Sequence, residues 1–162
     1  MPNPFEKFLT YEDKEHIRVV NYIADKLPDV LAFHIPSEGN KSAFERYKHS
    51  IFGNLKGLPD FAFMHPKYKS NNSFEIVYCG LFIELKADEH KRIVQKGKDA
   101  GKVVKTKGKL SKEQEVIIEK LNERGYKAVC CWGFDQAKIE IDKYFSDYYE
   151  IKKALGKNKF KK

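Results

Sequence analysis

Two short stretches of the sequence place charged residues at the ends of apolar segments. The stretch GLPDF carries Asp60, and GLFIELK carries Glu84 and Lys86. Successive side chains of a strand point to opposite faces of its sheet, so a strand through GLFIELK puts Glu84 and Lys86 on one face. Burying charged groups is costly unless they are paired or bind a metal. The residue types therefore leave two interpretations, a structural ion pair at a sheet end or a metal-dependent site.

Pairing of the two stretches as antiparallel strands would bring Asp60 and Glu84 together. Two carboxylates and a nearby backbone carbonyl form an oxygen-rich site of the kind that suits Mg²⁺ or Mn²⁺. Lys86 would lie beside such a metal, where its charge could orient a water molecule or stabilise charge that builds on a phosphate.

The spacing of apolar residues predicts the elements that must position this site. Helices are expected at 11–26, 43–55 and 111–124 and from Asp135 onward, and strands at 30–35, 60–64, 74–86 and 126–132. A short polar connection predicts that strands 60–64 and 74–86 are antiparallel, whereas the helix before strand 126–132 predicts a parallel crossover. We therefore expect an α/β fold with a mixed central sheet of about four strands flanked by helices.

The domain organisation is expected to be simple, because the sequence shows no internal repeat. We predict one domain over residues 1–150 and a basic tail at 151–162. Ser111 and Gln114 fit a capping box at the start of helix 111–124. Residues 87–110 form a long lysine- and glycine-rich connection, and connections of that length are usually functional or mobile.

Positive charge is concentrated in two segments of a chain whose formal net charge is +8. Residues 86–112 contain ten Lys or Arg and three Asp or Glu, and residues 152–162 contain six Lys and no acid, so the remainder is net negative. This pattern is typical of a polyanion binder, although a lysine-rich solubilising surface is the alternative. The candidate DNA contacts are Lys41, Ser42, Lys96, Lys98, Lys102, Lys105, Lys107 and Lys109.

Several other classes of function find no support. No apolar run is long enough to span a membrane, and the N-terminus has no pattern of a secretory signal. Cys79, Cys130 and Cys131 form no CxxC pair, so we expect buried free thiols in a reducing compartment such as the cytoplasm. Walker A, G-x-G-x-x-G and G-x-S-x-G motifs are lacking. His34 stands alone after a strand, and we expect a hydrogen-bonded or loop role for it.

The order of these stretches resembles the virus-type replication–repair nuclease (VRR-NUC) domain of the PD-(D/E)XK nuclease superfamily. GLPDF, GLFIELK, LSKEQ and GYKAVCCWGFDQAKIEIDKY follow one another as in that domain. YEDKEHIRVVNYI resembles its glutamate-bearing first helix, and FHIPSEGNKS resembles its histidine–proline–asparagine–glycine loop. The resemblance covers residues 11–144 and implies a PD-(D/E)XK restriction-endonuclease-like core.

The resemblance also implies roles for individual residues. Asp60 and Glu84 would bind Mg²⁺ or Mn²⁺, with the backbone carbonyl of Leu85 available as a further ligand. Lys86 would be the catalytic lysine.

Two further residues match the domain on its helices. Gln114 matches a glutamine on the helix after the sheet, in addition to its capping role. Glu15 best matches the first-helix glutamate, which helps to bind or position the metal, and Glu12 on the same helical face is its rival.

The resemblance implies a metal-dependent endonuclease that hydrolyses DNA phosphodiesters. Stand-alone domains of this kind are homodimers that cut branched DNA, so we expect an enzyme similar to a Holliday-junction resolvase. The alternatives are a flap or restriction-like nuclease and a non-catalytic DNA-binding or assembly module. Helix 43–55 and the aromatic C-terminal helix are candidate dimer surfaces, and packing in the core is the alternative for each.

Overall fold

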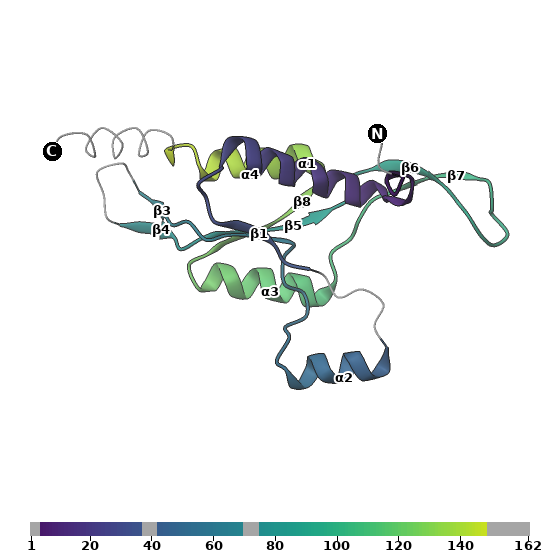
Figure 1. Cartoon of the computed structure of the whole chain (residues 1–162), viewed down its shortest axis with the longest axis horizontal. Helices are drawn as coiled ribbons and strands as arrows, with labels where there is room; N and C mark the ends of the chain where they lie inside the picture. The colour runs from purple at the N-terminus through teal and green to yellow at the C-terminus, as the bar shows by residue number, and fades with distance from the viewer. Residues whose placement is uncertain (1–3, 37–41, 70–74, 149–162) are drawn as a thin grey trace.

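A four-stranded mixed sheet forms the centre of the computed structural model, which describes residues 4–36, 42–69 and 75–148 (Figure 1). The strand order is β1 (Ala32–His34), β2 (Phe61–Phe63), β5 (Leu81–Lys86) and β8 (Lys127–Trp132). The pairs β1–β2 and β2–β5 are antiparallel, and β5–β8 is parallel. The sheet therefore confirms the predicted α/β fold, including the crossover between the last two strands.

Helices cover both faces of the sheet. α1 (Tyr11–Lys26), which follows a short 3₁₀ helix (Glu6–Phe8), lies with α4 (Gly133–Tyr144) on one face, and α3 (Lys112–Glu123) lies on the other (Figure 1). Burial on both faces explains why β2 and β5 are almost continuously apolar. The core side chains of these two strands are less than 2% exposed: Phe61, Phe63, Leu81, Ile83 and Leu85.

The predicted strand 74–86 is interrupted at Gly80. A Cβ atom at this position would lie 2.8 Å from the Phe63 carbonyl oxygen, so only glycine allows the close approach to β2. β4 (Ile76–Tyr78) is separate from β5 and pairs with β3 (Lys67–Tyr68) in a small antiparallel hairpin. The prediction of one long strand is therefore wrong.

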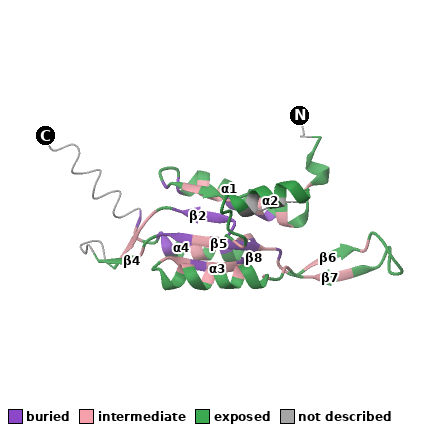
Figure 2. Cartoon of the chain, turned by 90° about the horizontal axis from the view of Figure 1, so that it is seen from below, coloured by how far each residue is buried: buried purple, intermediate pink, exposed green. Residues whose placement is uncertain are grey.

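Residues 87–110 also differ from the prediction, because they contain two strands. β6 (His90–Ile93) and β7 (Val103–Thr106) form an antiparallel ribbon that extends beyond the sheet (Figures 1 and 2). Charged side chains on both faces of the ribbon conceal the period of two that identifies a strand in a sequence.

α2 (Ala43–Ile51) stands away from the sheet (Figure 1). Phe44, Tyr47, Ile51 and Phe52, on or directly after this helix, are all at least 58% exposed. The alternative that this helix packs into the core is therefore wrong. The second candidate dimer surface, the aromatic C-terminal helix, falls largely at 149–162, outside the described residues.

The thiols and the helices bear on two other expectations. Cys131 is buried and Cys130 partly buried, but Cys79 is exposed, so the expectation of three buried thiols is wrong for Cys79.

None of the helices within the described ranges combines the length and the apolar character that a membrane span requires.

Candidate functional site

The pairing of β2 with β5 brings the two predicted carboxylates together. Phe61 lies opposite Ile83, so Asp60 reaches the backbone beside Glu84 at the end of β2. Asp60 Oδ2 accepts a 2.7 Å hydrogen bond from the backbone N–H of Leu85. Pro59 is less than 2% exposed and holds the chain extended just before Asp60. The predicted convergence of Asp60 and Glu84 is confirmed.

The Glu84 carboxylate is buried but only half paired. Lys86 Nζ lies 2.7 Å from Glu84 Oε1, and the Gln114 side-chain amide donates a hydrogen bond to the same oxygen. Glu84 is 1% exposed, and within residues 4–36, 42–69 and 75–148 its other oxygen, Oε2, has no hydrogen-bond partner. A buried acceptor without a hydrogen-bond partner costs free energy, and a ligand bound to this oxygen would reduce that cost.

Burial determines the protonation of this site. The pKa of Glu84 is raised to about 7, chiefly by burial and in part by the charges of Asp60 and Glu12, against the lowering effect of the hydrogen bond and charge of Lys86. Burial alone would lower the pKa of Lys86, but the hydrogen bond and charge of Glu84 outweigh it and raise that pKa. Lys86 is therefore cationic at neutral pH, while Glu84 is poised between its two forms.

The donor set fits a hard divalent cation. The unpaired oxygen of Glu84 and the carboxylate of Asp60 are the kind of ligand that Mg²⁺ and Mn²⁺ prefer, and a cation would favour the ionised form of Glu84. A buried ion pair compensates for desolvation only when further hydrogen bonds satisfy its remaining lone pairs, so the structural interpretation leaves the cost of Glu84 Oε2 unexplained.

Gln114 makes both of the contacts that the sequence indicated. Its side-chain Oε1 accepts from the backbone N–H of Ser111 at 2.9 Å, and its backbone N–H donates to Ser111 Oγ at 3.2 Å, which completes the capping box of α3. Its amide N–H₂ remains available to Glu84. Gly57, at a positive φ of 80°, packs against this helix start, because a Cβ there would lie 2.6 Å from the Glu113 carbonyl carbon.

Glu15 points its carboxylate at α4 rather than at Glu84. Its Oε2 accepts a 2.6 Å hydrogen bond from the backbone N–H of Phe134, in the first turn of α4, and its Oε1 accepts one of 2.9 Å from Arg18. A carboxylate at a helix N-terminus is stabilised by the helix dipole. The charge of Glu12, by contrast, acts on both Glu84 and Lys86. The negative charge of Glu12 thus raises the pKa of both groups, although it is a smaller cause than burial and the Glu84–Lys86 contact.

Two histidines next to Asp60 were not identified as a pair from the sequence. His16 Nε2 lies 3.6 Å from Asp60 Oδ2, and His34 brings a ring nitrogen to the same place. The expectation that His34 stands alone is therefore wrong. The feature that links His34 to Asp60 is the antiparallel pairing of β1 with β2. This pairing sets His34 opposite Phe61, which is the next residue after Asp60.

The predicted DNA-contact lysines gather on and around the β6–β7 ribbon, and all of them are exposed: Lys96, Lys98, Lys102, Lys105, Lys107 and Lys109. Lys102 and Lys105 pair with Asp99 and Glu89 at 2.6 and 2.8 Å. Such exposed pairs contribute little to stability and exchange readily for phosphate.

The remaining predicted contacts lie elsewhere. Ser42 accepts from the backbone N–H of Glu45 at 3.2 Å and so caps α2, while Lys41 and the tail 151–162 fall outside the described residues. Lys107 lies over the Trp132 ring, 4.7 Å from its centroid, at the base of the ribbon.

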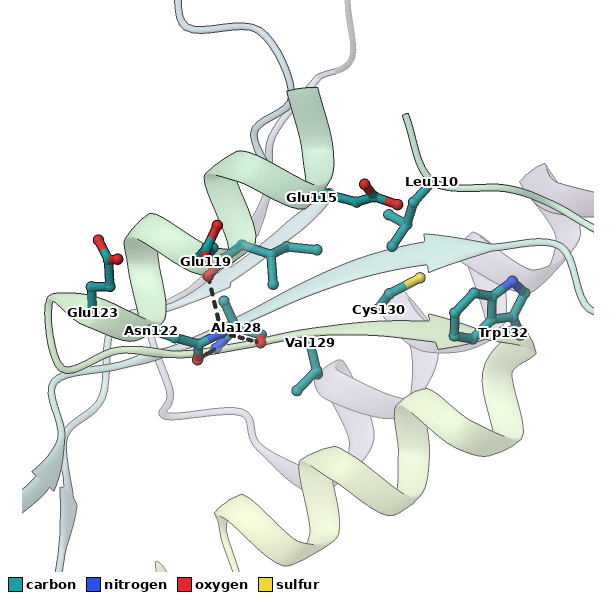
Figure 3. Close-up of a pocket in the computed structure, with 10 residues that line it drawn as sticks. Leu110, Glu115, Glu119, Asn122, Glu123, Ala128, Val129, Cys130 and Trp132 are labelled. Carbon is teal, nitrogen blue, oxygen red and sulfur yellow. Dashed lines mark hydrogen bonds between the residues drawn. The ribbon is translucent and has the colours of Figure 1, made fainter. Parts of the chain in front are cut away.

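A hollow between α3 and β8 does not suit a polyanion. Figure 3 shows Glu115, Glu119 and Glu123 along its helical edge, and Asn122 hydrogen-bonded to the backbone of Ala128. Its carboxylates would repel a phosphate backbone, so the basic ribbon is the better DNA surface.

The pH dependence of stability tests the burial of Glu84. Without metal, the folded state keeps a proton on Glu84 up to about pH 7, whereas the unfolded state releases it near pH 4.5. Raising the pH from 5 to 8 should therefore lower the free energy of unfolding of the wild type relative to Glu84→Gln, by about 3 kcal/mol in total. Urea unfolding in EDTA measures the free energy of unfolding of both proteins at each pH. Subtracting one from the other cancels the contribution of the histidines, which both proteins share. Parallel pH profiles would contradict the buried, protonated Glu84.

Known proteins share this fold. No protein-family model matches the sequence, and no curated protein matches it. Among solved structures, a VRR_NUC domain protein is similar, with a TM-score of 0.60 and 24% sequence identity over 85% of this chain and 90% of that chain. The likeness shows a shared fold across nearly the whole chain, and it confirms the resemblance expected from the sequence at the level of the fold.

Proposed function

We propose that this chain, which has the fold of a VRR_NUC domain protein, is a metal-dependent endonuclease that hydrolyses DNA phosphodiesters. The observation that carries the proposal is the Glu84 carboxylate, which is buried beside Asp60 with one oxygen paired to Lys86 and the other unpaired. A buried carboxylate oxygen without a hydrogen-bond partner supports a cation-binding role for this site over a purely structural one.

The residues divide the work of the reaction between them. Asp60, Glu84 and the backbone carbonyl of Leu85 would hold Mg²⁺ or Mn²⁺, which when bound supplies Lewis-acid chemistry toward a phosphate and a water molecule. Lys86 keeps its positive charge, so it can orient the attacking water and stabilise negative charge that builds on the phosphate. Gln114 fixes the orientation of Glu84 through its amide.

We also propose Glu12, rather than Glu15, as the first-helix carboxylate of the site. The contacts of Glu15 with Phe134 and Arg18 favour a role in joining α1 to α4. Glu12 is only partly exposed and its charge acts on Glu84 and Lys86, as a further metal-positioning group would.

The β6–β7 ribbon is the proposed grip on the DNA backbone, together with the tail 151–162. A two-stranded ribbon has the width to enter a major groove, and its lysines offer charge to phosphates on either side. The ribbon begins four residues after Lys86, so DNA held along it passes close to the carboxylates. Contacts of this kind position the backbone without reading its sequence.

A homodimer acting on branched DNA is the finer form of the proposal. The aromatic residues of α2 are exposed on a helix that stands away from the sheet, and a second copy would bury them. A symmetric four-way junction needs two cuts related by a two-fold axis, and a dimer supplies two such sites. We place this activity in the cytoplasm of a prokaryote, or of the host cell of a virus or phage that encodes the protein. The free cysteines agree with a reducing compartment of this kind.

Substitution of the carboxylates tests the nuclease. Asp60→Asn and Glu84→Gln should each lower cleavage at least about 100-fold with DNA binding retained, because each removes a ligand or charge at the reacting phosphate. Glu12→Gln should also lower cleavage, whereas the exposed Glu123→Gln should not. One preparation should be assayed on four-way junction, flap, single-stranded and linear duplex DNA with Mg²⁺ and with Mn²⁺. A protein that binds these DNAs and cuts none would instead be a non-catalytic module.

Neutralising the ribbon tests its interaction with DNA. The double variant Lys96→Gln, Lys98→Gln should weaken binding to all sequences alike and reduce the slope of log affinity against log salt by about one for each phosphate that the variant no longer neutralises. The matched control, Lys120→Gln with Lys143→Gln on α3 and α4, should leave the slope unchanged. Fluorescence anisotropy at several salt concentrations measures both. Equal slopes for the two variants would exclude the ribbon as the main DNA-binding surface.

Sedimentation tests the dimer through α2. The wild type should sediment as a dimer at micromolar concentration, and Phe44→Ser with Phe52→Ser should shift it to monomer, because these side chains are 68% and 69% exposed in one chain. Phe8→Ser, at a side chain that is 70% exposed on the 3₁₀ helix, is the control and should remain dimeric. A wild type that stays monomeric with a junction bound would overturn the resolvase form of the proposal.

A further inference from the structure

Three metal-binding side chains meet beside the carboxylate pair from three separate elements. His16 comes from α1, His34 ends β1, and Asp60 precedes β2. One ligand atom of each lies within 4.8 Å of those of the other two, and His16 Nε2 is 3.6 Å from Asp60 Oδ2. Residues so far apart in the chain converge here through the β1–β2 pairing and the packing of α1 over the sheet.

The Phe61 ring holds the two imidazoles in place. The ring centroids of His16 and His34 lie 5.0 and 5.6 Å from that of Phe61, and the two imidazoles meet edge to face at 5.2 Å. Phe61 itself is 1% exposed in the core and is paired in register with His34. A rigid aromatic base of this kind positions ligands with little loss of side-chain entropy.

We infer that His16, His34 and Asp60 form a second metal position, selective for a transition metal such as Mn²⁺ over Mg²⁺. Imidazole nitrogens suit transition metals, whereas Mg²⁺ prefers oxygen ligands throughout. Neighbouring ligand atoms around one bound metal ion lie roughly 3 Å apart, so the 3.6 Å between His16 Nε2 and Asp60 Oδ2 is only slightly wider than a bound ion requires. The His34 nitrogen lies within 4.8 Å of both of these atoms and would have to approach them when a metal binds. Three protein ligands leave coordination positions open for water or phosphate.

The simpler interpretation is a single contact between His16 and Asp60. An ion pair at 3.6 Å accounts for these two residues but gives His34 no reason to bring a third ligand atom to the same point. A shared cation is attracted to all three groups at once.

The position shares Asp60 with the proposed Mg²⁺ or Mn²⁺ site but not Glu84. Asp60 Oδ2 faces both His16 and the backbone N–H of Leu85, so this carboxylate stands between the two sites. Occupancy of one position should therefore influence the other. The inference concerns metal binding alone and does not depend on cleavage of DNA.

Binding of Mn²⁺ to the full chain tests this position. Calorimetric titration gives the affinity, and pulsed electron paramagnetic resonance detects nitrogen nuclei coordinated to bound Mn²⁺. His16→Gln and His34→Gln, which keep polar side chains of similar size, should each remove part of the nitrogen signal and weaken Mn²⁺ binding at least about tenfold. His90→Gln, at a ring that stacks on Tyr11 outside the cluster, is the matched control and should change neither. Circular dichroism confirms that each variant is folded.

The outcomes separate this inference from the proposed nuclease. Mn²⁺ that binds without nitrogen coordination, or with the same affinity in the histidine variants, would overturn the second metal position, even if Glu84→Gln abolishes cleavage. Mg²⁺ binding, measured by competition, should fall in Glu84→Gln and persist in His16→Gln. Nitrogen-coordinated Mn²⁺ in a protein that cuts no DNA would support the metal position while rejecting the nuclease.

Discussion

The burial of one carboxylate at the end of the central strand governs the structure around it. Glu84 sits on a strand covered on both faces, where an unpaired charge is costly, so neighbouring elements must supply partners. Lys86 does so from the same strand and Gln114 from α3. Both partners contact the same oxygen of Glu84, Oε1. The other oxygen, Oε2, is held in place with the rest of the carboxylate but has no hydrogen-bond partner among the described residues. Burial of Glu84 is therefore only partly compensated, and the oxygen that stays unpaired is the feature on which the proposed cation site depends.

The elements around the site are fitted to it at close range. Gly108, on the chain that returns from the ribbon, packs where a Cβ would lie 2.9 Å from the Cβ of Lys86, and its carbonyl accepts a 2.9 Å hydrogen bond from the Trp132 ring N–H. The base of the basic ribbon and the charged end of β5 are therefore one packed unit.

α1 serves packing and the site at once. Glu12, Glu15 and His16 are three and four residues apart, so they share one side of the helix. Glu15 anchors the helix to the N-terminus of α4, and the next residue, His16, lies 3.6 Å from Asp60. Outside this core the chain presents two surfaces of opposite character, the exposed aromatic side chains of α2 and the lysines of the ribbon. Each is available to a different kind of partner, one apolar and one anionic.

The sequence by itself determined what depends on neighbouring residues and on strand alternation. The pairing of GLPDF with GLFIELK, the shared face of Glu84 and Lys86, and the capping box of Gln114 all follow from short-range patterns, and the structure contains each of them. Only the tertiary structure shows that the Glu15 carboxylate is hydrogen-bonded to the start of α4, because no short stretch of sequence encodes the position of α4 relative to α1. Tertiary structure also joined His16, His34 and Asp60, since no local pattern links a helix, a strand end and a loop. The exposure of α2 is also visible only in the tertiary structure. The sequence of an amphipathic helix shows which side is apolar, but it does not show whether the rest of the chain covers that side.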